Sequence, residues 1–206
     1  QAVHLYSAEG EYVDAWHPFN DDARITGIAA GEDTVYVADA GNREVVRLSA
    51  EGDVRGKING EMPQEEASGF VIPSLYFDVA LGEKGGVWIT NPGKHTVQKY
   101  TGDGEFVRRW GKASAELEGF SGCCNPVYIV SMPDGKLATS EKGIKRVKTY
   151  TATGKLQSVV IPPAHYAEDT PPYEIAAGFN EQILALDKNR GIIRLFNKNP
   201  NSGEKE

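Results

Sequence analysis

The sequence VYVADAGNREVVRLSAEG, residues 35–52, contains the pattern that decides the fold. It begins with a β-branched and aromatic run, continues with a polar segment at residues 39–44, and returns to apolar residues at 45–48 before Gly52. Short apolar runs separated by turn residues are typical of β-strands joined by tight turns. This stretch therefore predicts two neighbouring strands and the turns that bound them.

The same pattern returns three times downstream with a nearly constant period. Two anchors mark each copy, the first residue of the second strand and the acid or amide that ends the first strand. Both anchors step by 52, 50 and 46 residues. The paired anchors are Asp39 and Val45, Asn91 and Val97, Glu141 and Val147, and Asp187 and Ile193. A repeat of about 40 to 50 residues made of short strands predicts a β-propeller with one four-stranded blade per repeat.

We therefore predict an all-β fold, a single β-propeller domain over residues 1–206 built of four-stranded antiparallel blades. Three blades are complete, and a partial blade stands at each end. The N-terminal piece supplies third and fourth strands and the C-terminal piece supplies the first three, so the two do not complete each other. This favours part of a larger propeller over one irregular blade. The expected spans are 1–16 (partial), 24–58, 74–110, 125–160 and 173–196 (partial).

Composition and charge exclude several classes of protein. A formal net charge of -7 and the lack of an arginine-rich cluster argue against nucleic-acid binding. No apolar run approaches the roughly 20 residues of a membrane-spanning helix. The sequence also has no G-x-S-x-G nucleophile motif and no G-x-x-x-x-G-K phosphate loop.

Residues 35–43, followed by a short strand and Ala-Glu-Gly, resemble the NHL repeat. The resemblance covers nearly the whole chain in strand pattern, closely in the first copy and more loosely in the others. It implies a propeller that binds a protein, a nucleic acid or a small ligand. One enzymatic branch of the family, the peptidyl-hydroxyglycine lyases, holds a metal in the channel through histidines. Together with the negative charge and a first residue other than Met, the resemblance leads us to expect a periplasmic or secreted location.

The stretch Cys123-Cys124-Asn125-Pro126 is the least ordinary part of the sequence. It precedes the innermost strand of the third blade, which places it near the mouth of the channel. Adjacent cysteines can close a vicinal disulfide, bind a soft metal as thiols, or pack as small semi-buried residues. These three interpretations remain open, although the chain has no C-x-x-C motif.

We expect the ligand site on the face that carries the connections between blades, because propeller-like scaffolds present binding residues on loops. The expected ligand-binding residues are Arg24, Cys123, Cys124, Asn125, Glu141, Lys142 and Tyr173. The acids and amide that end the first strand of each copy are interpreted as turn-fixing hydrogen-bond acceptors, with Glu141 as the exception that faces the ligand. The residues at or near the starts of inner strands, which line the channel or pack the blades, are Tyr76, Asp78, Tyr128, Tyr173 and Glu174.

These observations favour a non-catalytic propeller that binds a small ligand or a protein partner at the channel mouth, with no cofactor, metal ligand or catalytic residue assigned. A first alternative is a metal-dependent lyase or hydrolase related to the peptidyl-hydroxyglycine lyases, with bound zinc or calcium. It needs histidines at equivalent repeat positions, whereas His4, His17, His95 and His165 occupy different ones. A second alternative is a structural or assembly module, which the partial blades favour.

Overall fold

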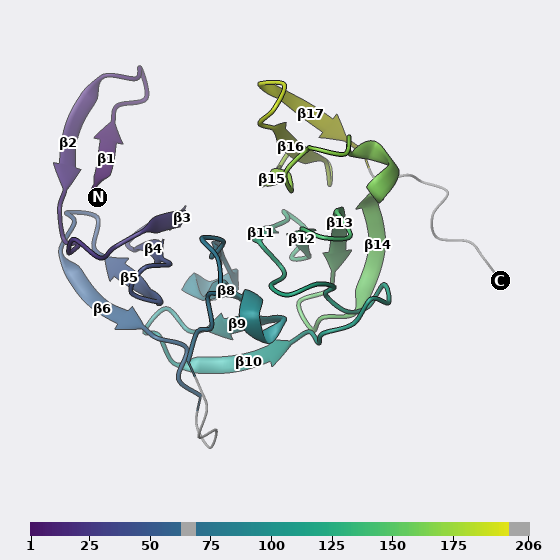
Figure 1. Ribbon diagram of the computed structural model, residues 1–206. Coiled ribbons are helices and arrows are strands. Elements are labelled where there is room, and N and C mark those ends of the chain that lie inside the picture. Colours follow the sequence, from purple (N-terminus) through teal and green to yellow (C-terminus); the bar gives the residue numbers. More distant parts are fainter. Residues whose placement is uncertain (63–68, 198–206) are drawn as a thin grey trace.

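The computed structural model describes residues 1–62 and 69–197. These residues form five antiparallel sheets that follow one another along the chain. Figure 1 shows the sheets as the blades of a β-propeller, arranged in an arc. The predicted fold class is confirmed, with three four-stranded sheets between a two-stranded and a three-stranded one.

The N-terminal partial blade contains β1 (Val3–Tyr6) and β2 (Tyr12–Trp16). Blade 1 contains β3 (Ile25–Ala30), β4 (Val35–Asp39), β5 (Glu44–Leu48) and β6 (Val54–Ile58). Blade 2 contains β7 (Val79–Leu81), β8 (Val87–Asn91), β9 (Thr96–Tyr100) and β10 (Phe106–Trp110). Blade 3 contains β11 (Tyr128–Ser131), β12 (Leu137–Glu141), β13 (Arg146–Tyr150) and β14 (Leu156–Ile161). Blade 4 contains β15 (Glu174–Ala177), β16 (Ile183–Asp187) and β17 (Ile192–Phe196).

Three single-turn 3-10 helices lie in the loops of the described residues, at Glu83–Gly85, Pro92–Lys94 and Pro163–His165. In the described residues no helix is long and apolar enough to cross a membrane.

The innermost strands β3, β7, β11 and β15 contact one another in that order around the inside of the arc. The outer strands β2, β6, β10 and β14 form its rim (Figure 1). Apolar residues of neighbouring blades make the core, as where Tyr36 and Ile58 of blade 1 meet Val79 and Tyr100 of blade 2. The hydrophobic effect therefore joins blade to blade, which fixes the inner strands around a common channel.

A repeated contact couples two of the outer strands, β2 and β10, to the next blade. Trp16 at the end of β2 packs on Gly52 in the β5–β6 turn, and Trp110 at the end of β10 packs on Gly154 in the β13–β14 turn. Both glycines have positive φ, +90° and +85°, and a Cβ added to either would stand 2.4 Å from the indole ring. Only glycine meets both the backbone and the packing requirement of this contact.

The first strand of each sequence copy is the second strand of its blade in the structure. The acid or amide that ends this strand is buried in every copy, with at most 1% of its surface exposed. Asp39 Oδ1 accepts hydrogen bonds from the backbone N–H groups of Gly41 (3.0 Å) and Asn42 (3.2 Å) in its own turn and of Arg24 (2.8 Å) in the preceding connection. Asn91 likewise accepts from Val71 N–H at 2.9 Å. The turn-fixing interpretation is confirmed for Asp39, whereas the described side-chain hydrogen bonds of Asn91 join it to Gly69 and Val71 of the preceding connection.

The same hydrogen bonds place the connections between blades beside the turns between second and third strands. We call this side of the propeller the connection face. It comprises the connections 17–24, 59–62 with 69–78, 111–127 and 162–173, and the turns 40–43, 92–95, 142–145 and 188–191.

Candidate functional site at the channel mouth

Asn125 fixes the vicinal cysteines on the connection face. Its buried side chain accepts a hydrogen bond from Lys142 N–H (2.8 Å) and donates to the carbonyl oxygens of Lys142 (2.7 Å) and Ser121. Its backbone N–H donates to Pro92 O of blade 2 at 3.1 Å. The Asn125–Pro126 peptide is cis. The stretch is therefore held against the turn of its own blade and that of the preceding blade.

The two thiols differ in exposure and in surroundings. Cys123 is exposed and Cys124 is buried, and their Sγ atoms lie 3.1 Å apart as free cysteines. Cys124 Sγ also lies 3.5 Å from Ser74 Oγ, which accepts a 3.0 Å hydrogen bond from Lys142 Nζ. Burial raises the pKa of the Cys124 thiol, but hydrogen bonds from Lys142 and Ser74 outweigh it and hold that pKa below its ordinary value.

Two lysines lie over two tyrosines at the same face. Lys142 Nζ is 5.1 Å from the centroid of the Tyr76 ring, and Tyr76 meets Tyr128 edge to face at 5.7 Å. Lys188 Nζ lies 5.5 Å from the centroid of the Tyr128 ring and donates to its hydroxyl at 3.2 Å. These cation–π contacts contribute roughly 0.5–1 kcal/mol each at exposed sites.

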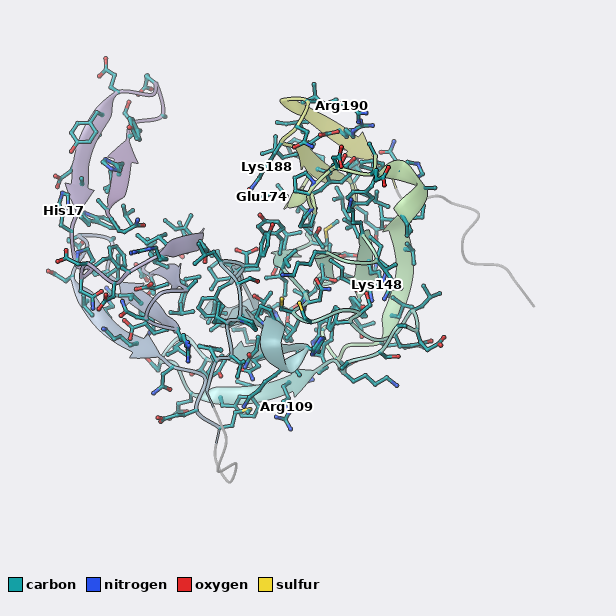
Figure 2. The ribbon with its side chains drawn as sticks, viewed as in Figure 1. His17, Arg109, Lys148, Glu174, Lys188 and Arg190 are labelled. Atoms are coloured by element: carbon teal, nitrogen blue, oxygen red, sulfur yellow. The ribbon has the colours of Figure 1, made fainter. Side chains whose placement is uncertain are left out.

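Lys188 also pairs with Glu174 at 2.9 Å, and Figure 2 shows both side chains at the inner edge of blade 4. Burial lowers the pKa of Lys188, but its hydrogen bonds to Glu174 and Tyr128 outweigh this and raise it overall. The connected residues, drawn from three blades, are named the mouth cluster: Ser74, Tyr76, Cys123, Cys124, Tyr128, Lys142, Glu174 and Lys188.

A ring of equivalent positions lies where the mouth cluster meets the channel. Asp78, Tyr128 and Glu174 occupy the same place on successive blades, beside Thr90, Ser140 and Leu186 of the second strands. A cavity of about 510 Å³ between the inner strands is bordered by Asp78 and Glu174. Burial raises the pKa of the Asp78 carboxyl to about 7. The channel wall therefore carries an acid that changes charge near neutral pH.

The structure brings together four of the seven expected ligand-binding residues: Cys123, Cys124, Asn125 and Lys142. Arg24 is exposed in the connection of blade 1, where its guanidinium donates to the carbonyl oxygens of Asp21 (3.0 Å) and Ala23 (2.6 Å). It shares no described contact with the other four.

Glu141 and Tyr173 require a correction, because both side chains are fully buried. The Glu141 carboxylate pairs with Lys148 at 2.7 Å and Arg146 at 3.1 Å, and these cations also bind carbonyl oxygens of the 111–120 segment. Tyr173 stacks on Tyr166 with ring centroids 4.2 Å apart and donates its hydroxyl hydrogen to His165 O. Their partners are protein groups, so the two residues support the loops of the face rather than meet a ligand.

Sequence reasoning missed the part played by Ser74 and Lys188. A signal for Lys188 exists, because it follows Asp187 as Lys142 follows Glu141 and so occupies the same repeat position. No comparable signal marks Ser74, which is 50 residues from Cys124 in sequence and reaches it only through the packing of blade 2 on blade 3.

The four histidines lie apart in the fold. His17 is on the outer side of the arc (Figure 2), and His95 Nε2 lies 2.7 Å from the carbonyl oxygen of Gly122, the residue before Cys123. His165 packs its ring against Phe196, and His4 lies in β1. Within residues 1–62 and 69–197 no group of three or more His, Cys, Asp or Glu side chains is arranged to hold a metal ion.

Solved structures similar to this chain are β-propellers. Virginiamycin B lyase from Staphylococcus aureus matches with a TM-score of 0.60 and 18% identity, over 94% of this chain and 62% of the lyase. A protein of unknown function from Bacteroides caccae matches with a TM-score of 0.62 and 12% identity, over 98% of this chain and 66% of that one. A chain of a nidogen/laminin complex matches with a TM-score of 0.57 and 18% identity, over 81% of this chain and 57% of its own length.

The fold and these likenesses define the chain as a β-propeller protein, and they do not single out the NHL type. No protein-family model matches the sequence, and a search of curated proteins gives no match. The chain spans less than two thirds of the length of the structures it resembles. At such low identity the likeness concerns the fold alone.

Proposed function

We propose that this chain is a non-catalytic binding propeller of the NHL type, whose ligand or protein partner docks on the connection face at the mouth cluster. The observation that carries the proposal is the surroundings of Lys142. Its half-buried ammonium group lies beside a hydroxyl, a thiol and an aromatic ring, and no carboxylate of the described residues pairs with it within 4.0 Å. A buried or half-buried cation is ordinarily paired, because desolvation penalises its charge.

The chemistry of the cluster indicates the group that binds there. An ammonium group with free donor capacity suits a carboxylate or a phosphate. The edge-to-face pair of Tyr76 and Tyr128 adds apolar surface with a polar rim, a combination common in binding sites. We therefore infer that the bound ligand, or the contacting part of a partner, presents an anionic group to Lys142.

The experiment uses inorganic phosphate and citrate as probes and measures their binding by isothermal titration calorimetry. Lys142→Met should weaken binding at least about tenfold, which corresponds to about 1.4 kcal/mol. Lys155→Met is the matched control, because Lys155 is an exposed lysine in the β13–β14 turn, outside the mouth cluster. Equal affinities in the two variants, or no binding of either probe to the unchanged protein, would overturn the proposal.

A second candidate, an assembly module, is favoured by apolar side chains at both ends of the arc. Tyr12 and Val13 on β2 are 59% and 62% exposed, and Ile193 and Leu195 on β17 are 69% and 53% exposed. Exposed apolar patches and sheet edges mark interaction surfaces. Sedimentation over a range of concentrations tests this role: a monomer at all concentrations counts against self-assembly, and loss of association in Ile193→Lys supports it.

The similarity to virginiamycin B lyase from Staphylococcus aureus supports the fold and no activity for this chain, because the identity is 18%. We retain an extracytoplasmic location as part of the proposal, since disulfides persist there and the chain has adjacent cysteines. Fractionation of cells that produce the full-length protein tests this location.

A further inference from the structure

We infer that Cys123 and Cys124 form a thiol–disulfide exchange site, at which a low-molecular-weight disulfide is reduced and the cysteines close a vicinal disulfide. The inference rests on the two thiols and their neighbours and does not require the ligand proposed above. Their Sγ atoms are 3.1 Å apart, in contact and unbonded. The described chain contains no other cysteine that could compete for either sulfur.

Exposure assigns the two sulfurs different roles. Cys123 is exposed and can meet a molecule from solution, whereas Cys124 is only 1% exposed. The groups facing Cys124 are Lys142 from the turn after β12, Ser74 from the connection before β7, and Cys123 itself. A cation and a hydroxyl beside a sulfur favour the thiolate, which is the nucleophilic form.

Covalent geometry indicates a reactive disulfide rather than a permanent one. Consecutive Cα atoms are about 3.8 Å apart across a trans peptide and nearer still across a cis one, which is below the roughly 4.4–6.8 Å usual for a disulfide. Strained or exposed disulfides are the more easily reduced ones, and they serve exchange or regulation. The position of this pair on a loop of the connection face suits such a role.

Exchange proceeds in two balanced steps. Cys123 gives up its thiol proton, and its sulfur attacks one sulfur of the external disulfide R–S–S–R, so that a mixed disulfide forms and one RS⁻ leaves. The Cys124 thiolate then attacks the Cys123 sulfur, the Cys123–SR bond breaks, and the second RS⁻ leaves. The two cysteines are oxidised by two electrons, and the external disulfide is reduced to two thiols.

The test incubates the folded protein with oxidised glutathione and follows its intact mass with time. The unchanged protein should lose two hydrogen atoms and retain no glutathione, and peptide mapping should join Cys123 to Cys124. Cys124→Ser should stop at a stable glutathione adduct on Cys123. Cys123→Ser should react at least about tenfold more slowly, because its remaining thiol is buried.

Two lysine variants test whether Lys142 positions and activates Cys124. Lys142→Met should slow the second step several-fold and leave adduct formation on Cys123 unchanged, whereas Lys155→Met should change neither. A merely structural role of Lys142 would alter both steps or the circular dichroism spectrum. Accumulation of the glutathione adduct in the unchanged protein, or two alkylatable thiols after treatment, would overturn the inference.

Discussion

The Asp78 carboxylate of blade 2 accepts a hydrogen bond of 2.9 Å from the backbone N–H of Ile129 in blade 3. On its other side the carboxylate approaches Gly27 of blade 1 so closely that a Cβ there would stand 2.4 Å from Asp78 Oδ1. One acidic side chain thus bridges three successive inner strands at the wall of the channel. The ionisation of Asp78 therefore affects the packing of three blades.

Replacing Asp78 by Asn should make the protein less sensitive to pH. Because burial raises the folded-state pKa of Asp78 from 3.8 to about 7, the folded state binds more protons than the unfolded state between these values, and stability falls as pH rises through them. Asp78→Asn removes this loss and should be more stable than the unchanged protein at pH 8 by roughly 1–2 kcal/mol. Urea unfolding at pH 4, 6 and 8 measures the difference, and a constant difference across the series contradicts the assignment.

Replacing Glu141 by Gln should destabilise the protein strongly. The change leaves Lys148 and Arg146 buried without their carboxylate, a loss that typically costs about 3–5 kcal/mol. Burial already lowers the pKa of Lys148, and Glu141 opposes that effect. Glu44→Gln is the control, because Glu44 pairs at 2.7 Å with a Lys57 side chain that is 55% exposed, and such pairs contribute about 1 kcal/mol or less. Equal losses in urea unfolding would contradict the prediction.

Replacing Gly154 by Ala should lower the free energy of unfolding more than the same change at Gly10. Both residues have positive φ, +85° and +86°, so the backbone penalty of roughly 1–2 kcal/mol is shared. At Gly154 the new methyl group also collides with Trp110, whereas nothing lies within 4 Å at Gly10. We expect an additional loss of about 1–3 kcal/mol at Gly154. Thermal unfolding and tryptophan fluorescence measure it, and matching melting temperatures would contradict the packing argument.

Oxidation of the cysteine pair should strengthen the binding of anionic probes. Lys142 favours the thiolate form of Cys124, which would compete with an anionic probe for the ammonium group, and a disulfide can no longer ionise. Phosphate should therefore bind several-fold more tightly to the oxidised protein than to the reduced protein. The difference should vanish in Lys142→Met. Titration calorimetry on both redox forms measures the effect, and weaker binding after oxidation would contradict it.

The repeat could be read from the sequence because strand period and turn chemistry are local properties. The spacing of Asp39, Asn91, Glu141 and Asp187 predicts blades, and the structure has a turn-forming second strand ending at each of them. Much of the candidate site could not be predicted from such local patterns. Whether Glu141 faces a ligand or a buried lysine depends on Lys148, whose side chain is directed inward by the pairing of β12 with β13.

Contacts between blades were the hardest feature to predict. Cys124 meets Ser74 across the seam between blades 2 and 3, and no periodic signal marks which residue of one connection faces which residue of the next. The adjacent cysteines are recognisable in the sequence as an unusual dipeptide. Their division into an exposed and a buried sulfur appears only when Asn125 and Lys142 fix the connection against its turn.

Because Trp16 packs on Gly52 and Trp110 packs on Gly154, the stability of a blade depends on the blade that follows it in the chain. The ends of β2 and β10 are each held by a turn of the blade that follows, so disruption of that turn is transmitted backwards to the preceding blade.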